Sequence, residues 1–293
     1  MQRGEGGEHW KTCGYWTKTK ALRVVLGEQK RDGDAERVKV VLVTMKDLEP
    51  NEAREGGPVE ETEVDPYFFD DGYTLAATTG FARVWEGAEA MTRWLTRTRA
   101  AGRGTRVCEL GAGVGECGLV LAALGCHVVL TDVRAVVEDV IRRNIAQNGE
   151  GTETRGEAWP NALTMGDGSA SRATLDWTDP VPARPFGKDC EVTFFDADVL
   201  IAAECVWLRE LLAPFVSTTS TLLRGGVEKL LLSVRDRSSS EDPSSGKAFA
   251  NTKEVIRAFE NAGCVVETLH REESTEDEGK DIVILDIRAV SRG

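Results

Sequence analysis

The sequence lacks several patterns that common kinds of functional site require. Its seven cysteines include no C-x-x-C pair, and its three histidines do not stand at the spacing of metal ligands. No apolar run is long enough for a transmembrane helix, and residues 1–10 lack the hydrophobic core of a signal peptide. We therefore expect reduced cysteines, no metal site and no membrane attachment. The expected location is the cytoplasm, with the nucleus as a second location.

A surplus of basic residues is also missing. The chain contains 36 Lys and Arg residues against 49 Asp and Glu residues, which gives a formal net charge of -13 at pH 7. A protein that follows nucleic-acid phosphates needs the opposite balance, so we expect no nucleic acid as a partner. The acidity suits a basic partner, although it would equally serve to keep the protein soluble.

The composition that remains is ordinary for a globular protein, with 293 residues of which 41% are hydrophobic and 29% are charged. It favours one large α/β domain over two small ones. The clearest pattern lies in residues 105–133, which predict a buried strand at 105–110, a glycine turn, a helix at 115–124 and a second strand at 126–130. Asp132 then follows at the carboxyl edge of the sheet, beside the turn, which is a nucleoside-binding arrangement.

The spacing of the glycines indicates which nucleoside. Gly111, Gly113 and Gly115 form G-x-G-x-G, whereas a dinucleotide-binding turn has G-x-G-x-x-G, and the place of its third glycine is taken here by Glu116. Glu109 and Glu116 would repel a pyrophosphate, so the pattern disfavours an NAD-dependent oxidoreductase.

The same carboxylates suit a cationic ligand. S-adenosylmethionine carries a sulfonium and an ammonium group, and Asp132 would accept hydrogen bonds from its ribose hydroxyls. The alternative is a structural glycine turn in another α/β protein.

Three segments together resemble a known family. The motif ELGAGVGECG at 109–118, LDW at 175–177 and DVLIAAECVW at 198–207 resemble the seven-stranded methyltransferases of family 16, which include many protein-lysine methyltransferases. The resemblance runs from about Phe81 to Arg288. It implies an α/β fold with a Rossmann-like seven-stranded sheet, mostly parallel with the last strand antiparallel, and S-adenosyl-L-methionine as cofactor.

The family also suggests the domain organisation. Residues 1–65 look like an N-terminal extension with a β-hairpin formed by 21–26 and 37–44, and residues 66–293 look like the methyltransferase domain. The polar insertion at 149–172 is expected to be a flexible loop, and the charged segment at 270–280 a solvated hairpin tip. The remaining predicted helices are 86–97, 133–147, 207–223 and 252–262. After the insertion a third strand is expected to end at 175–177, and the fourth to seventh strands are 199–203, 229–234, 264–269 and 281–287.

The resemblance further implies cofactor contacts outside the glycine turn. Trp85 would stand at the wall of the cofactor site, although a tryptophan packed in the core is an equal alternative. Asp176 or its backbone would meet the adenine amine, and Trp177 would pack on the adenine ring. Ala203, at the end of the fourth strand, completes this set.

The fourth strand leads directly into the residues that would act on the acceptor. Ligands bind at the carboxyl ends of parallel strands, so Glu204 should face the transferred methyl group. A carboxylate that caps the following helix is the alternative for Glu204. The family has an acid, two residues and then usually tyrosine; here Trp207 takes that place, which excludes any role that needs a phenol.

The leading hypothesis is N-methylation of a lysine side chain in a protein substrate by a monomeric enzyme. Glu204 would orient the amine, while Trp207 and Trp85 would enclose the methylene stem and exclude water. The alternatives are a small-molecule amine, a histidine or a protein N-terminus as the methyl acceptor, or a methyltransferase-like binding protein without turnover.

Overall fold

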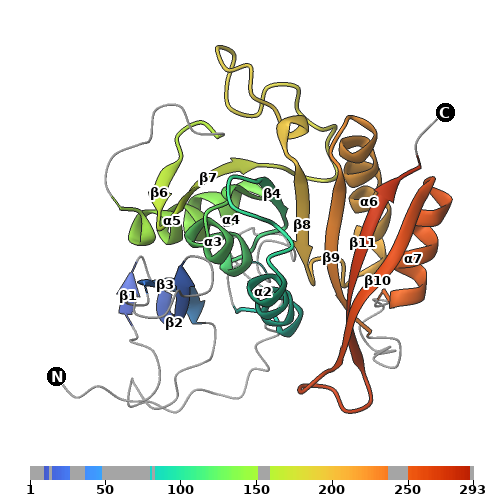
Figure 1. The fold of residues 1–293 in the computed structure, drawn as a ribbon, viewed down its shortest axis with the longest axis horizontal. Helices are drawn as coiled ribbons and strands as arrows, with labels where there is room; N and C mark the ends of the chain where they lie inside the picture. Colours follow the sequence, from blue (N-terminus) through green and yellow to red (C-terminus); the bar gives the residue numbers. More distant parts are fainter. Residues whose placement is uncertain are drawn as a thin grey trace, which may run out of the picture.

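The computed structural model describes residues 10–12, 15–26, 37–47, 80, 83–150, 159–236 and 250–290. Within these residues the strands form one large sheet of eight strands and one small N-terminal sheet of three (Figure 1). The domain boundary predicted at residue 65 lies outside the described residues, so it stays a prediction.

The large sheet has the order β10-β11-β9-β8-β4-β5-β7-β6. Five strands are parallel: β4 (Arg106–Leu110), β5 (His127–Asp132), β7 (Gly168–Thr174), β8 (Val199–Ala203) and β9 (Lys229–Arg235). The last strand, β11 (Asp281–Ala289), runs antiparallel between β9 and β10 (Cys264–Glu273). The predicted sheet is therefore confirmed, and β6 (Leu163–Met165) is added antiparallel at its edge.

Helices cover both faces of this sheet (Figure 1). In β8, Val199 and Ile201 pack with α2 (Glu86–Thr98) and α3 (Glu116–Ala123), whereas Leu200 and Ala202 pack with α6 (Arg209–Arg224) and α7 (Thr252–Asn261). Such two-sided burial explains the continuous apolar runs of the central strands. The helix predicted at 133–147 is found as α4 (Arg134–Val136), the π-helical turn η1 (Val137–Ile141) and α5 (Arg142–Asn148).

The expected flexible loop at 149–172 is wrong for its second half. Residues 151–158 lie outside the described residues, but β6 and most of β7 fall within the range. The Ser169 hydroxyl lies 2.9 Å from Nδ1 of His127, and the Ser171 hydroxyl donates to a backbone carbonyl. Because these buried hydroxyls find partners inside the protein, the strand needs no apolar run and the sequence pattern conceals it.

The segment at 270–280 forms the expected hairpin tip between β10 and β11 and is exposed at most positions, but the expectation is wrong for its first residues and for Ser274. The strand β10 continues to Glu273, and Ser274 after it is buried. The Ser274 hydroxyl donates to Oε2 of Glu86 at 2.5 Å, and the Thr275 hydroxyl donates to Oε1 at 2.7 Å. The polar residues of the tip therefore bind the start of α2, and their composition alone does not reveal this.

The N-terminal sheet contains the predicted hairpin, with strands longer than expected. It is formed by β1 (Trp10–Thr12), β2 (Tyr15–Leu26) and β3 (Arg37–Asp47). The edge of β3 that does not pair with β2 binds amide side chains of α5 instead. Asn144 accepts from the backbone N–H of Thr44 and donates to its carbonyl, at 3.0 and 2.9 Å, and Asn148 does the same with Leu42, at 2.7 and 2.6 Å. Two amides one helical turn apart thus take the place of a neighbouring strand.

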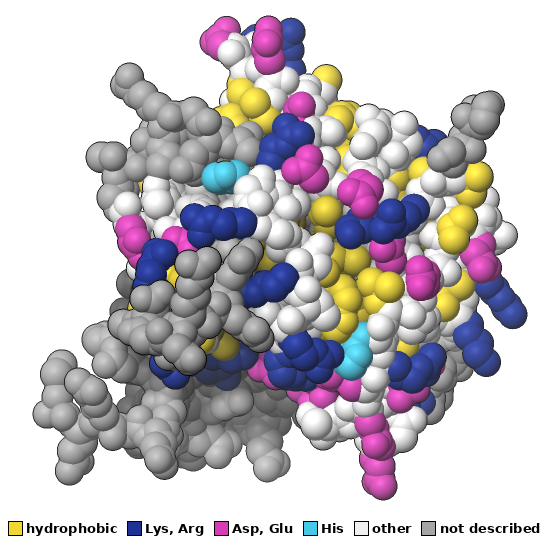
Figure 2. Space-filling model, in the orientation of Figure 1, with side chains coloured by type: hydrophobic (Ala, Val, Ile, Leu, Met, Phe, Trp, Pro, Cys, Tyr) yellow, Lys and Arg dark blue, Asp and Glu magenta, His cyan; other side chains and the backbone are white. Residues whose placement is uncertain are grey.

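Figure 2 shows Lys and Arg side chains interspersed with Asp and Glu over one face of the molecule. Hydrophobic side chains are visible between them near the middle of this face. In the part of the chain that the structure describes, no helix is both long enough and apolar enough to span a bilayer.

Candidate active site

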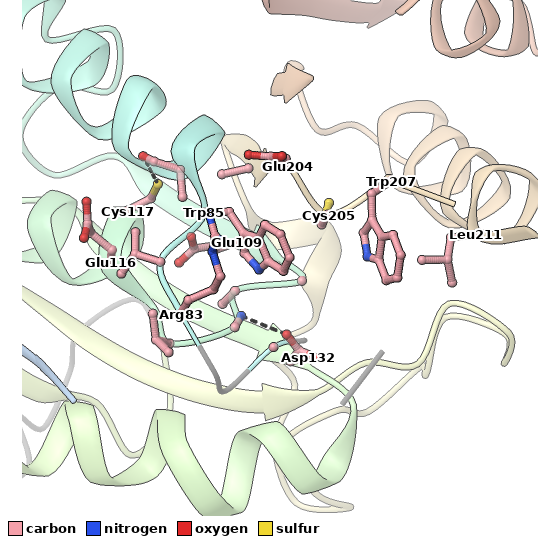
Figure 3. Close-up of a pocket in the computed structure, with 18 of the residues that line it drawn as sticks. Arg83, Trp85, Glu109, Glu116, Cys117, Asp132, Glu204, Cys205, Trp207 and Leu211 are labelled. Carbon is pink, nitrogen blue, oxygen red and sulfur yellow. Dashed lines mark hydrogen bonds between the residues drawn. The ribbon is translucent and has the colours of Figure 1, made fainter. Parts of the chain in front are cut away.

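A pocket lies at the carboxyl ends of β4, β5 and β8. The chain passes from β4 to β5 and β7 on one side and then returns to place β8 on the other side of β4, so the pocket stands at the switch in strand order where ligands bind in open α/β sheets. Figure 3 shows the side chains that converge on it. The predicted site residues among its lining are Trp85, Glu109, Gly111, Gly113, Asp132, Trp177, Ala203, Glu204 and Trp207.

Two predicted site residues, Gly115 and Asp176, are not among the lining residues. Gly115 precedes the first residue of α3 with φ +85°, and a Cβ there would stand 2.5 Å from Cδ2 of Leu130. It serves the packing of the helix start on β5. The Asp176 carboxylate accepts from the backbone N–H and the hydroxyl of Thr178, at 2.9 and 2.7 Å, which forms a local turn.

The glycine turn after β4 approaches its neighbours too closely for any side chain. Gly111 has φ +64°, and a Cβ there would lie 2.8 Å from Cβ of Cys205 and 2.9 Å from the Trp177 ring. Gly113 has φ +55°, and its Cβ would lie 2.8 Å from the carbonyl oxygen of Gly80. Glycine is required at both positions by conformation and by space, and the exposed backbone can meet a ligand directly.

Asp132 is the last residue of β5 and points at this turn. Its Oδ2 accepts from the backbone N–H of Gly113, and its Oδ1 accepts from that of Val133, both at 2.8 Å. Burial raises the pKa of Asp132 to about 6. Each carboxylate oxygen has a second lone pair, so Asp132 can still accept from hydroxyl groups of a ligand such as a ribose.

Two further carboxylates are buried beside the turn. Glu109 accepts from the backbone N–H of Gly118 at 3.0 Å, and burial raises its pKa to about 8. Glu116, the first residue of α3, pairs with the Lys20 ammonium at 2.8 Å. Among the lining residues that the structure describes, Arg83 is the one with a basic side chain. The excess of carboxylates makes the pocket suitable for a cationic ligand.

Glu204 stands at the end of β8 in a conformation that is uncommon for a residue with a side chain, with φ +49°. Its Oε2 accepts from the backbone N–H of Gly87 at 2.6 Å, and its Oε1 pairs with Nε of Arg235 at 2.8 Å. Gly87 lies in the first turn of α2, so the carboxylate caps that helix. The alternative is a cap on the following helix, α6, but the two carboxylate oxygens of Glu204 are directed at the start of α2 and at Arg235.

Arg235 joins Glu204 to the hairpin of β10 and β11. Only 5% of its side chain is exposed, and Nη1 lies 3.5 Å from Glu86, 2.7 Å from Glu276 and 3.2 Å from Asp277. A guanidinium group can meet several carboxylates at once because its donors point in fixed, separate directions. The ends of β8 and β9, the start of α2 and the hairpin tip are therefore held in one ionic network.

Aromatic side chains form the remaining walls. Trp85 precedes the first residue of α2, and the guanidinium carbon of Arg83 lies 4.5 Å from the centre of its ring. Trp207 is 8% exposed. Trp177 packs with the edge of Phe215 at a centroid distance of 4.9 Å. These rings can enclose the apolar parts of a ligand while the carboxylates meet its charge.

The structure adds lining residues that the sequence patterns did not identify. Two of them could have been predicted from the sequence. Cys205 stands between the predicted residues Glu204 and Trp207, and Leu211 follows Trp207 by four positions, which is a helical spacing. Arg83 and Cys117 carry no comparable signal. The others are Gly80, Val84, Ala88, Ala112 and Val114, whereas Glu116, also in the lining, is one of the two carboxylates that the sequence indicated for a cationic ligand. In the described residues, no group of His, Cys, Asp and Glu side chains could hold a metal ion.

Comparisons with known proteins show which families the chain resembles. A family model described as lysine methyltransferase matches residues 76–244. Methyltransferase-like protein 22 of Mus musculus is 29% identical over 148 residues, which are 48% of this chain and 35% of that protein. Calmodulin-lysine N-methyltransferase of Arabidopsis thaliana is 28% identical over 148 residues, which are 50% of this chain and 42% of that protein. Protein N-lysine methyltransferase METTL21A of Danio rerio is 27% identical over 151 residues, which are 51% of this chain and 59% of that protein.

The matched part is thus well short of the full length of these relatives, between 35% and 59%. Among solved structures, magnesium protoporphyrin IX methyltransferase from Synechocystis PCC 6803 with bound SAH is similar with a TM-score of 0.45 and 15% identity, covering 69% of this chain and 81% of that one. The YcgJ protein from Bacillus is similar with a TM-score of 0.46 and 12% identity, covering 69% of this chain and 100% of that one.

The glycine turn can be tested with one substitution and a matched control. Gly113→Ala places a Cβ against the Gly80 carbonyl, and we expect the affinity for S-adenosylhomocysteine to fall at least about tenfold, or ~1.4 kcal/mol. The control is Gly104→Ala. Gly104 also has a positive φ, +79°, but a Cβ added there would have no atom within 4 Å. This substitution should cost only the backbone strain of ~1–2 kcal/mol in stability and leave the affinity unchanged. Calorimetry and thermal melting on both variants make the comparison, and equal affinities would contradict this role of the turn.

The Asp132 carboxylate predicts a dependence of binding on pH. With a pKa of about 6, it takes up a proton as the pH falls below that value, and a protonated carboxyl accepts hydrogen bonds from ribose hydroxyls less well. The affinity for S-adenosylhomocysteine should therefore decrease from pH 7 to pH 5, approaching about tenfold per pH unit. Asp132→Asn should bind more weakly at pH 7 and show a shallower decrease, because Glu109 still titrates in this variant. Calorimetry at several pH values measures both, and parallel profiles would exclude Asp132 as the titrating group.

Proposed function

We propose, because the chain belongs to the lysine methyltransferase family, that it is an S-adenosylmethionine-dependent enzyme that methylates a lysine side chain of a protein. The observation that carries the proposal is the pocket at the ends of β4, β5 and β8, which combines buried carboxylates with aromatic walls. Two relatives support the substrate class by their names, calmodulin-lysine N-methyltransferase and protein N-lysine methyltransferase METTL21A.

The pocket residues fit this cofactor. Gly111 and Gly113 leave the backbone open, as a Cβ at either would collide with its surroundings. Asp132 would hold the ribose hydroxyls, and Trp177 would pack on the adenine ring. Glu109 would lie near the positive charge of the ligand. When bound, the cofactor supplies an electrophilic methyl group, and the protein contributes alignment of the acceptor, which can be worth ~7–11 kcal/mol in favourable cases.

The acceptor side is formed by Trp85, Trp207 and Glu204. The two indole rings would enclose the methylene stem of a lysine and keep water from the amine. Glu204 is fixed by the Gly87 N–H and by Arg235, so its charge stands at a defined place at the end of β8. There it would orient the amine and stabilise the positive charge that the nitrogen acquires on methylation.

The setting of the reaction is part of the proposal. A net charge of -13 supports a protein partner rather than a nucleic acid. The described cysteines are free, and burial raises the pKa of the thiols of Cys108, Cys117 and Cys205, which suits a reducing compartment such as the cytoplasm or the nucleus. The enzyme would act as a monomer.

The function is tested by transfer of a labelled methyl group. The purified protein is incubated with tritiated S-adenosylmethionine and a cell lysate, and the labelled band is analysed by mass spectrometry. We expect methyl-lysine in one protein, and much less label with Gly113→Ala at a cofactor concentration that does not saturate this variant. Label on a small molecule, a histidine or a protein N-terminus would reassign the acceptor. Cofactor binding without any transfer would indicate a binding protein.

The role of Glu204 can be separated from its structural contacts by a comparison with Glu86. Both carboxylates are buried and pair with Arg235, but only Glu204 lines the pocket. Glu204→Gln and Glu86→Gln should each lower the free energy of unfolding by ~1–3 kcal/mol. Only Glu204→Gln should also lower the single-turnover rate, by more than about tenfold with cofactor affinity nearly unchanged, because the lost interaction is with the nucleophile. A single-turnover rate that is the same in both variants would remove Glu204 from the reaction.

A further inference from the structure

One charged side chain of the N-terminal sheet reaches the wall of the pocket. Lys20, on β2, lies 2.6 Å from Oε1 of Glu89 in α2 and 2.8 Å from Oε2 of Glu116 in α3. Glu116 lines the pocket, and only 2% of its side chain is exposed. Figure 1 shows the small sheet packed beside the helices that carry these acids. A segment that precedes the methyltransferase core in the sequence therefore contributes to the electrostatics of its pocket.

Glu116 needs this partner to remain charged. Burial raises the pKa of its carboxyl, and the ammonium of Lys20 limits that rise, whereas Glu89 acts in the opposite direction. Without Lys20, the carboxylate would be left buried with no cation at the distance of an ion pair among the described residues. Such a group is costly as an anion and tends to take up a proton.

Docking of the hairpin does not depend on Lys20 alone. The edge of β3 is held by Asn144 and Asn148, and Lys39 donates to the carbonyl oxygen of Asn148 at 3.0 Å and pairs with Glu150. Neither Asn148 nor Glu150 lines the pocket. Lys39 therefore attaches the hairpin to the core as Lys20 does, but without a contact to a pocket carboxylate, and it is a matched control.

We propose that the N-terminal hairpin completes the cofactor site, with Lys20 as a positioning residue that keeps Glu116 ionised to receive the ammonium group of the methionyl end of the ligand. This rests on the proposed function in one respect, the identity of the cofactor. Asp132 and Trp177 are assigned to the nucleoside, so the wall formed by α2 and α3, where Glu116 stands, faces the other end of the ligand. Lys20 acts through Glu116 and does not itself line the pocket.

The arrangement couples docking of the hairpin to binding of the cofactor. If a docked hairpin raises the affinity for the ligand, the bound ligand must stabilise the docked hairpin by the same factor. Residues 15–26 and 37–47 should therefore exchange their amide hydrogens more slowly when S-adenosylhomocysteine is bound. This effect should disappear in Lys20→Met and persist in Lys39→Met.

The decisive measurement is the affinity for S-adenosylhomocysteine, which needs no methyl acceptor. Lys20→Met should weaken binding at least about tenfold, whereas Lys39→Met should change it less than about twofold, although both variants lower the melting temperature. Lys20→Arg should keep most of the affinity. In a Glu116→Gln background, Lys20→Met should cause no further loss, because the two residues act as a pair.

The outcomes distinguish the inference from the function on which it rests. The inference is overturned if wild-type protein and Lys20→Met bind S-adenosylhomocysteine equally well, or if Lys39→Met weakens binding as much as Lys20→Met. In either case the Lys20–Glu116 ion pair is only structural, and the proposed function stands. If the wild-type protein does not bind S-adenosylhomocysteine, the cofactor assignment and the inference both fall. The inference is also overturned if Lys20→Met and Glu116→Gln together weaken binding of S-adenosylhomocysteine by the sum of their separate effects on the binding free energy.

Discussion

The buried ion pair between Arg235 and Glu204 is the contact on which the acceptor side of the pocket depends. Each side chain is almost fully enclosed, and each has further partners: Arg235 meets the hairpin acids, and Glu204 caps the start of α2 at Gly87. Loss of Arg235 would remove the cation that compensates the buried Glu204 carboxylate, which is far more costly than the net worth of the pair, whereas Arg235 without Glu204 would keep its other carboxylate partners. The pair therefore fixes where β8, β9 and α2 meet, and with them the position of Trp85 at the head of α2.

On the opposite side of the pocket, a neutral side chain helps to hold the glycine turn. Asn144 binds both backbone groups of Thr44 in β3 and also donates to the carbonyl oxygen of Val114 in the glycine turn at 2.7 Å. One buried amide thus connects the hairpin, α5 and the turn. The turn is thus held both by this amide and by the Asp132 carboxylate, which accepts from the Gly113 N–H. The amide contacts respond less to pH and salt than the carboxylate and the ion pairs of the acceptor side.

Local patterns were sufficient to predict the parallel core, the glycine turn and Asp132, and membership of the family is confirmed by the match over residues 76–244. These features are short-range, because the turn and the strand that precedes it are adjacent in the sequence. The pairs Lys20–Glu116 and Arg235–Glu204 join residues from distant elements, and no local pattern identifies them. The first part of the strand that contains Ser169 was assigned to the insertion for a related reason, since its buried hydroxyls are satisfied only in the tertiary structure.

The buried carboxylates also bear on the release of product. Burial raises the pKa of Glu109 to about 8 and that of Asp132 to about 6, so in the free protein near pH 7 Glu109 is largely protonated and Asp132 largely ionised. A ligand cation beside Glu109 favours its ionised form, so binding of S-adenosylmethionine would release a proton. Transfer of the methyl group removes the sulfonium charge, and with it part of the attraction to these carboxylates. The electrostatics of the pocket would therefore favour binding of the methyl donor over retention of the demethylated product.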